Sequence, residues 1–385
     1  MIVRIAGTYV HVLELPLLVF LLLAVTVRLA RNGFRLKATD VRLPMLLLLS
    51  LVLYTCAIAL SAWNAVDLGR VAKSALKWAE VVVLVALVFA WVERKKEFAL
   101  VYWTLALSGT LAVFHVLVLV AVGRLPLLGY RLFPGIEALL ALALLLPFLR
   151  KSNLLIVVLA AVCVLSTVLS MSRTAWIALP LLLFFDYKRS LLSGALVRSA
   201  LGGIAVVLIA VYLLDPNLLL YRWTELFSVT HVSNLERWTL LKTALTLFLR
   251  HPLTGVGSLN FPRVLQQQGP ILAIVAPDPD RLEPHNAFLQ VLAEEGFIGF
   301  SFFLLSLGAC WLLLRAASRG SGLSAPYRVG LEGFFLVMAI YLMFGFISAQ
   351  FRFFLALSFG LAAATTKVLP GDSSTLSPTK RHEGE

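Results

Sequence analysis

Charge is the scarcest property of this sequence. Only 14% of its 385 residues are charged, whereas 60% are hydrophobic. Soluble globular proteins carry about 25% charged and about 45–50% apolar residues. The shortage of charge therefore excludes an ordinary soluble domain, and the composition predicts a polytopic membrane protein.

Cysteines and motifs of soluble enzymes are also scarce. The three cysteines, Cys56, Cys163 and Cys310, lie inside apolar runs without the spacing of a zinc site or a disulfide framework, so we interpret them as core residues. No serine lies in a nucleophile elbow, which argues against Ser-His-Asp hydrolysis. The segment around Gly255 and Gly257 lacks the lysine of a P-loop and follows no strand. We interpret it as a tight turn.

The sequence shows neither a short cleavable signal nor an internal repeat. The first apolar run, 10–29, is long enough to span and is interpreted as an anchor that remains in the bilayer. The missing repeat disfavours transporters built from inverted repeats. Hydrophobic windows predict about eleven crossings of an all-α polytopic membrane protein. They lie at 10–29, 43–62, 75–91, 98–122, 135–149, 154–172, 174–185, 195–214, 297–314, 331–349 and 353–369.

Lysines and arginines are distributed unevenly between alternate connections. One set of connections holds 19 of them and the other holds 14, and the richer set is predicted to be cytoplasmic. The long connection 215–285 is then outside, and the net charge of +13 does not indicate nucleic acid. We divide the chain into N-terminal transmembrane helices (1–214), a long periplasmic loop (215–285), C-terminal transmembrane helices (286–369) and a disordered cytoplasmic tail (370–385).

The cations that remain outside have two interpretations: they bind something anionic, or the long loop is exempt from the charge rule. Arg173 is the most unusual of them, because it interrupts an apolar run between 154 and 185. A guanidinium in such a run costs several kcal/mol unless it reaches water or a partner. We predict two short helices that meet at 172–174 near one membrane face. Arg173 is then either a functional residue or a turn residue at the interface.

Arg237 lies in a predicted amphipathic helix of the long loop. Asn234 is its expected N-cap, and the helix is expected to end at His251 and Pro252 and to lie on the membrane surface. Its apolar stripe comprises Leu240, Leu241, Ala244, Leu245, Leu247 and Phe248. A cation in the first turn is disfavoured by the helix dipole unless an anion such as a phosphate intervenes. The alternative is a snorkelling arginine.

His285 lies in the predicted first turn of another helix. Pro284 sets the helix start, and Asn286, Gln290 and Glu294 fall on one of its faces. A neutral imidazole there could accept a proton from a hydroxyl or donate to a phosphate oxygen. The alternative is a solvated helix end.

Asp278 and Asp280 have the spacing of a D-x-D motif, which can bind a divalent metal through carboxylate oxygens. An acidic loop punctuated by prolines is the simpler interpretation. We expect no metal to be required and activity to survive EDTA. A metal requirement would make these two aspartates the candidate ligands.

Three stretches resemble, in order, blocks of the O-antigen ligase and O-antigen polymerase superfamily. They are SRTAW at 172–176, ERWTLLKTALTLFLRHPLTGVGSLNF at 236–261 and PHNAFLQVLAEEGFIGF at 284–300. The resemblance is strongest over about 165–315. It implies a GT-C-like fold of about 11–12 transmembrane helices and a glycosyltransferase of the bacterial inner membrane, with its active site facing the periplasm.

The resemblance also implies a reaction and roles for residues. A glycan moves from undecaprenyl diphosphate to a hydroxyl of a glycolipid or glycan acceptor, such as lipid A core, with inversion and without a cofactor. Arg173 and Arg237 would bind the diphosphate, and His285 would assist the acceptor. Arg131, in YRLFPG, matches a third arginine less securely. Guanidinium groups can stabilise a departing diphosphate without a metal.

Two alternatives stay open. A polysaccharide polymerase of the same superfamily would use the same residues with a second lipid-linked glycan as acceptor. A transporter of an anionic solute would also need outward arginines, but it has no use for a 70-residue outer loop with amphipathic helices.

Overall fold

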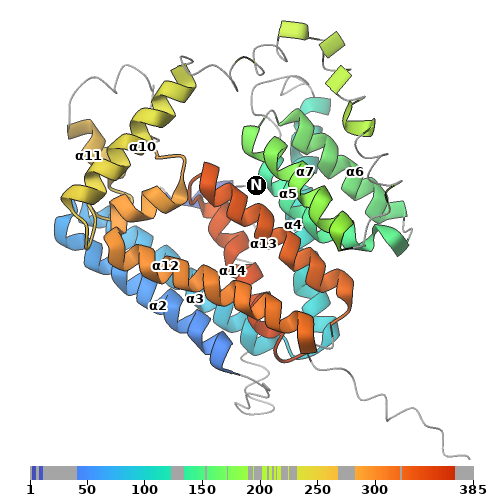
Figure 1. Cartoon of the computed structure of the whole chain (residues 1–385), viewed down its shortest axis with the longest axis horizontal. Coiled ribbons are helices and arrows are strands. Elements are labelled where there is room, and N and C mark those ends of the chain that lie inside the picture. The colour runs from blue at the N-terminus through green and yellow to red at the C-terminus, as the bar shows by residue number, and fades with distance from the viewer. Residues whose placement is uncertain are drawn as a thin grey trace, which may run out of the picture.

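The computed structural model describes residues 2–5, 8–11, 41–122, 134–151, 154–170, 172–189, 232–267, 282–320 and 323–368, with short pieces between 194 and 224. Helices dominate this part of the chain (Figure 1). The α-helices are α2 (Arg42–Leu60), α3 (Leu68–Trp91), α4 (Lys95–Ala121), α5 (Gly135–Leu145), α6 (Leu154–Leu169), α7 (Arg173–Lys188), α10 (Val232–Arg250), α11 (Phe261–Gln267), α12 (Ala287–Gly320), α13 (Ala325–Phe344) and α14 (Ala349–Ala364). Short 3₁₀ helices follow α2 and α5, namely η1 (Ser61–Asn64) and η2 (Leu146–Lys151).

Membrane-spanning helices account for most of the bundle. The segments long and apolar enough to cross are Arg42–Asn64, Leu68–Trp91, Lys95–Ala121, Ala287–Ala317 and Ala325–Phe344. Shorter apolar helices occupy Gly135–Leu149, Leu154–Leu169 and Phe351–Ala364. The predicted class, an all-α polytopic membrane protein, is confirmed.

The N-terminus departs from the helical prediction. Strand β1 (Ile2–Ile5) pairs antiparallel with β2 (Thr8–His11), and their β-branched residues favour this pairing. The strand β2 takes the first two residues of the predicted window 10–29, and the rest of that window lies outside the described residues. Most of the predicted window 195–214 also lies outside them.

The spanning helices share one apolar core. Helix α12 packs along α2, and α14 packs along α3, while α5 is surrounded by α4, α6 and α13 (Figure 1). Every residue of α5 from Ala138 to Leu145 is fully or almost fully buried. A helix that is apolar on all sides takes such a central place because it has no face suited to water.

The turn between α6 and α7 agrees with the sequence. Helix α6 ends at Leu169 and α7 begins at Arg173, so the apolar run 154–185 forms two short helices as predicted. The hydroxyl of Ser172 caps α7 by accepting a hydrogen bond from the N–H of Ala175 (3.4 Å). Trp176 donates its indole N–H to the carbonyl of Val168 (3.0 Å) and ties the two helices together.

The predicted loop helix exists as α10, and part of its apolar stripe packs on protein. Leu240, Ala244 and Leu247 are buried in a second apolar cluster, separate from the main core. The cluster is completed by Val256, Phe261, Leu265, Leu282 and Ala293. Half of the predicted stripe therefore packs on protein, where α11 and the first part of α12 cover it, whereas Leu245 of the same stripe is 47% exposed.

Helix α12 bends sharply at Gly296 (Figure 1). The φ of Gly296 is 67°, a conformation that residues with a Cβ rarely adopt. The turn after α10 packs into the bend: Phe297 donates its N–H to the carbonyl of Pro252 (2.7 Å), and Gly257 donates its N–H to that of Glu294 (2.9 Å). A Cβ on Gly296 would collide with the backbone of Leu253.

Candidate functional site

Arg173 joins the first turns of two helices. It is the first residue of α7, and its guanidinium donates a hydrogen bond to the side-chain carbonyl of Asn234, near the start of α10. Both side chains are half-buried. Arginine presents five donors in a planar fork, and this contact orients the fork.

Arg237 follows Asn234 by three residues on α10, and residues at this spacing share one face of a helix. The structure therefore brings Arg173 to the face of α10 that carries Arg237. One prediction is corrected here. Because α10 begins at Val232, Asn234 is not its N-cap, and Arg237 lies in the second turn, where the helix dipole acts more weakly. Asn234 orients Arg173 instead of capping the helix.

His285 lies in a left-handed turn directly before α12. Its φ is 44°, which is uncommon for a residue with a Cβ and costs of order 1–3 kcal/mol. The prediction that His285 lies in the first turn of the helix is wrong, because α12 begins two residues later, at Ala287. The half-buried imidazole lies edge-on to the ring of Phe346, with ring centroids 6.2 Å apart.

Asn286 holds this turn from both sides. Its side-chain carbonyl accepts a hydrogen bond from the N–H of Leu289 (3.0 Å) and caps α12. Its amide N–H donates to the carbonyl of Met343 (3.0 Å), at the end of α13. The strained conformation of His285 is therefore fixed by contacts with two helices.

The polar face that the sequence predicts for this helix is present and points inward. Gln290 and Glu294 are 4% and 2% exposed. The side-chain carbonyl of Gln290 accepts from the N–H of Ile347 (3.4 Å), and the Glu294 carboxylate accepts from the N–H of Phe261 (3.1 Å). Gln290 and Glu294 thus satisfy buried backbone N–H groups, at Ile347 and at the start of α11.

Glu295 forms a second buried set of contacts. Its carboxylate accepts hydrogen bonds from the hydroxyls of Tyr54 (2.9 Å) and Ser258 (2.7 Å). The N–H of Ser258 in turn donates to the hydroxyl of Ser61 (3.0 Å). These bonds lock α2, the turn after α10 and the bend of α12 to one another.

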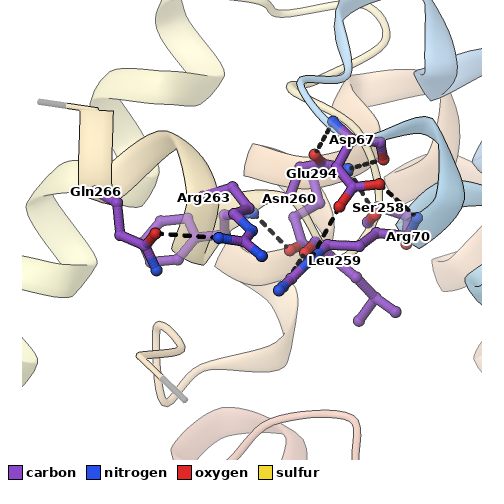
Figure 2. Close-up of polar contacts among 9 residues, drawn as sticks. Asp67, Arg70, Ser258, Leu259, Asn260, Arg263, Gln266 and Glu294 are labelled. Atoms are coloured by element: carbon purple, nitrogen blue, oxygen red, sulfur yellow. Dashed lines mark hydrogen bonds and ion pairs between the residues drawn. The ribbon is translucent and has the colours of Figure 1, made fainter. Parts of the chain in front are cut away.

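The same turn is held by the start of α3 (Figure 2). Asn260 accepts from the N–H of Asp67 (2.7 Å) and donates to the Asp67 carbonyl (3.1 Å). Arg70 donates to the carbonyl of Leu259 (3.3 Å) and forms an ion pair with Asp67 (3.5 Å). The turn at Gly255 and Gly257 is confirmed as a tight turn, since both glycines have positive φ and their N–H groups donate to protein carbonyls.

Glu283 lies two residues before His285, and the sequence placed it only near the possible metal ligands Asp278 and Asp280. One of its carboxylate oxygens is buried without a hydrogen-bond donor in the described part of the chain. Burial and, to a smaller extent, the nearby Glu294 raise the pKa of Glu283 against the opposing effect of Arg352, and the resulting value is about 8. The carboxyl is therefore largely protonated at neutral pH. In the sequence, the position of Glu283 two residues before His285 is the feature that could have indicated a role at this site.

Three other predicted residues are not placed. Arg131, Asp278 and Asp280 lie outside the described residues. Within the described part of the chain, no three His, Cys, Asp or Glu side chains gather as metal ligands would.

The three candidate residues that the structure describes lie on three neighbouring elements. Arg173 lies on α7, Arg237 on α10 and His285 at the start of α12, and α10 packs directly on α12. Guanidinium groups bind phosphates through paired N–H donors. A partly exposed imidazole can move a proton at neutral pH. The arrangement can therefore bind an anionic leaving group and activate a hydroxyl.

Comparison with known families agrees with this chemistry. Residues 155–304 match a family model described as O-antigen ligase, and this range includes Arg173, Arg237 and His285 but not Arg131. The match confirms the predicted resemblance to the O-antigen ligase and polymerase superfamily and implies a glycosyltransferase of the ligase or polymerase type. None of the curated proteins compared matches the chain.

Proposed function

Given that residues 155–304 match the O-antigen ligase family, we propose that this protein transfers a glycan from undecaprenyl diphosphate to an acceptor hydroxyl. The reaction takes place at the periplasmic face of a bacterial inner membrane. The acceptor is lipid A core or a similar glycolipid or glycan. The observation that carries the proposal is the contact between Arg173 and Asn234, which holds a guanidinium ready at the junction of α7 and α10.

The chemistry assigns one task to each residue. The acceptor oxygen attacks the anomeric carbon, the bond from that carbon to the diphosphate oxygen breaks, and the hydroxyl proton passes to the imidazole of His285. The diphosphate leaves with both bonding electrons, and Arg173 and Arg237 stabilise its growing charge. Arg131 is a further proposed diphosphate ligand. Attack opposite the leaving group inverts the anomeric configuration, and no metal or cofactor takes part.

The decisive experiment is glycan transfer by purified protein from an undecaprenyl-diphosphate donor. We expect His285→Ala, Arg173→Ala and Arg237→Ala each to lower the rate by about 10²-fold or more. Arg250→Ala, at the exposed far end of the same helix as Arg237, is the matched control and should keep wild-type activity. All variants must remain folded and monodisperse.

The choice of acceptor separates ligase from polymerase. Transfer to lipid A core or another glycolipid supports the ligase, whereas transfer only to a second lipid-linked glycan identifies a polymerase. Full activity of the His285 variant would remove the imidazole from the mechanism. Failure of the wild type with every acceptor would favour transport of an anionic solute.

A further inference from the structure

Helix α10 is apolar on two opposite faces. One face packs into protein through Leu240, Ala244 and Leu247, which are at most 2% exposed. The opposite face exposes a second stripe of large apolar side chains, which we call the outer stripe. It consists of Leu235 (49% exposed), Trp238 (58%), Leu245 (47%) and Leu249 (67%). These residues recur at intervals of three, seven and four, so they share one face. A water-exposed helix normally carries polar residues there.

Polar groups beside the outer stripe are satisfied without water. The hydroxyls of Thr239, Thr243 and Thr246 each donate to the carbonyl four residues earlier, at 2.8–2.9 Å. Lys242 lies on the stripe, but its ammonium group reaches over the ring of Trp238, 5.2 Å from the centroid. Such lysines cover apolar surface with their stems while the charge reaches the head groups.

The outer stripe continues onto the surface of the spanning helices. Leu253, which follows α10, is 64% exposed, and its carbonyl accepts the N–H of Ile298 (3.2 Å). The neighbouring Phe297, on spanning helix α12, is 58% exposed. Trp63, at the end of the span formed by α2 and η1, is 85% exposed. The next residue, Asn64, donates to the Thr254 hydroxyl (2.9 Å), which places Trp63 at the same end of the bundle.

The orientation of α10 fits a membrane boundary. Figure 1 shows α10 lying across the end of the bundle formed by α2, α3 and α12, rather than alongside these helices. Tryptophan is enriched where a membrane-spanning surface meets the head groups. Trp63 lies at the end of the span Arg42–Asn64, and Trp238 belongs to α10, which lies at the same end of the bundle (Figure 1). A helix in the membrane plane buries its apolar face at the boundary between head groups and acyl chains.

We propose that the outer stripe of α10 is a lipid-binding face, immersed in the head-group region of the leaflet at this end of the bundle. Its partner is the phospholipid bilayer, and the helix therefore touches protein on one side and lipid on the other. A consequence rests on the proposed function: lipid contact would hold Arg237, on the same helix, at the depth where a lipid-linked diphosphate lies.

Quenching of Trp238 in nanodiscs tests this surface. The difference in fluorescence between wild type and Trp238→Phe isolates this indole from the other tryptophans. We expect strong quenching by phospholipids brominated near the head group, weaker quenching by lipids brominated near the chain ends, and little quenching by aqueous iodide. Trp78, which is 2% exposed in the core, is the control, and its difference signal from Trp78→Phe should respond to none of the quenchers.

Two outcomes would overturn the proposal. Quenching of Trp238 by iodide but not by bromolipids would place the stripe in water. Protection from every quencher would show that a second copy or another protein covers it. Neither readout depends on catalysis, so failure of the lipid-binding face is distinguishable from failure of the proposed glycan transfer.

A second arm measures the consequence for activity. Leu245→Gln combined with Leu249→Gln should reduce bromolipid quenching of Trp238 at least about twofold and raise the KM for the lipid-linked donor, with kcat almost unchanged. The Leu245→Ile and Leu249→Ile double variant keeps the apolar area and should show wild-type bromolipid quenching and a wild-type KM. An unchanged bromolipid signal in the glutamine variant would contradict the assigned face.

Discussion

At the scale of single residues, the acids near His285 are as unusual as the arginines. Glu283 and Glu294 lie within electrostatic range of each other, and Glu294 and one carboxylate oxygen of Glu283 are buried. Glu294 has a backbone N–H as donor, whereas one oxygen of Glu283 is buried without such a donor in the described residues. Burial of a charge without adequate partners favours the neutral form. Glu283 therefore retains its proton near neutral pH.

The pH dependence of stability tests this assignment. The pKa of Glu283 is raised to about 8 in the folded protein, against about 4.3 for an exposed glutamate. The folded state thus binds more protons than the unfolded state between these values. The stability that the protonated Glu283 carboxyl contributes is complete below the pKa of the unfolded state and is lost as the pH rises through the pKa of the folded state. We expect Glu283→Gln to be more stable than wild type at pH 9 and to lose this advantage at pH 5. Thermal unfolding of the detergent-solubilised protein measures the difference.

A glutamate far from the site serves as control for this experiment. Glu93 lies in the connection between α3 and α4. We expect the stability of the Glu93→Gln variant to follow the wild-type pH profile. A Glu283→Gln variant that follows the same profile as wild type would show that Glu283 is ionised in the folded protein.

The sequence could single out some site residues and not others, for a physical reason. Arg173 was recognisable because a cation in an apolar run is costly wherever the chain folds. Its partner Asn234 was not, because the hydrogen bond joins helices 61 residues apart in sequence. Glu283 is similar, since its pKa is raised by burial and by Glu294, which only the folded chain brings near.

At the scale of elements, the bend in α12 organises the polar side of the fold. The turn 252–257 packs into the bend and donates two N–H groups to carbonyls that the bent helix leaves open. Gly296 and Gly255 make this possible, because a Cβ on either would collide with the backbone of the other segment. The residues after this turn connect it to η1 and to the start of α3, since Ser258 donates its N–H to Ser61 and Asn260 accepts the N–H of Asp67.

Two glycines of α12 provide a matched pair for this account. Gly296→Ala should lower the free energy of unfolding by about 3 kcal/mol or more, because it adds a clash and an unfavourable positive φ. At Gly308, in the exposed straight part of the same helix, a Cβ meets nothing within 4 Å. Gly308→Ala should therefore be neutral or stabilising by up to about 1 kcal/mol. Thermal unfolding of both variants gives the comparison, and similar losses at both positions would contradict it.

Helix positions were predictable from hydrophobicity alone, whereas their surroundings were not. The windows at 43–62 and 98–122 closely match α2 and α4, and 75–91 lies within α3, because a bilayer requires long apolar helices. The window 331–349 instead runs past the end of α13 at Phe344. The period of α10 was equally visible, but the sequence could not tell which of its apolar faces meets protein. That choice depends on Phe261 and Ala293, which reach α10 only through the turn and the bend.

At the scale of the whole molecule, the charge distribution assigns the two ends of the bundle to opposite sides of the membrane. The connection between α3 and α4 carries Arg94, Lys95 and Lys96, and belongs to the set richer in lysine and arginine. Helices α10 and α11 belong to the other set and lie together at one end of the bundle (Figure 1). Positive connections remain in the cytoplasm, so α10, α11 and the arginine site are expected outside.

Cysteine labelling in oriented membrane vesicles tests this arrangement. Gln267→Cys, exposed on α11, should react with a membrane-impermeant maleimide in right-side-out vesicles, and Lys96→Cys should react only in inverted vesicles. Cys56 is exposed on α2 and should be replaced by serine, whereas Cys163 and Cys310 are buried. The reverse labelling pattern would place Arg173 and Arg237 on the cytoplasmic side. A periplasmic transfer reaction would then be impossible, although the anion-binding chemistry of the site would remain. The orientation of the protein in the membrane and the anion-binding chemistry of its arginines are therefore independent, and the labelling determines the orientation alone.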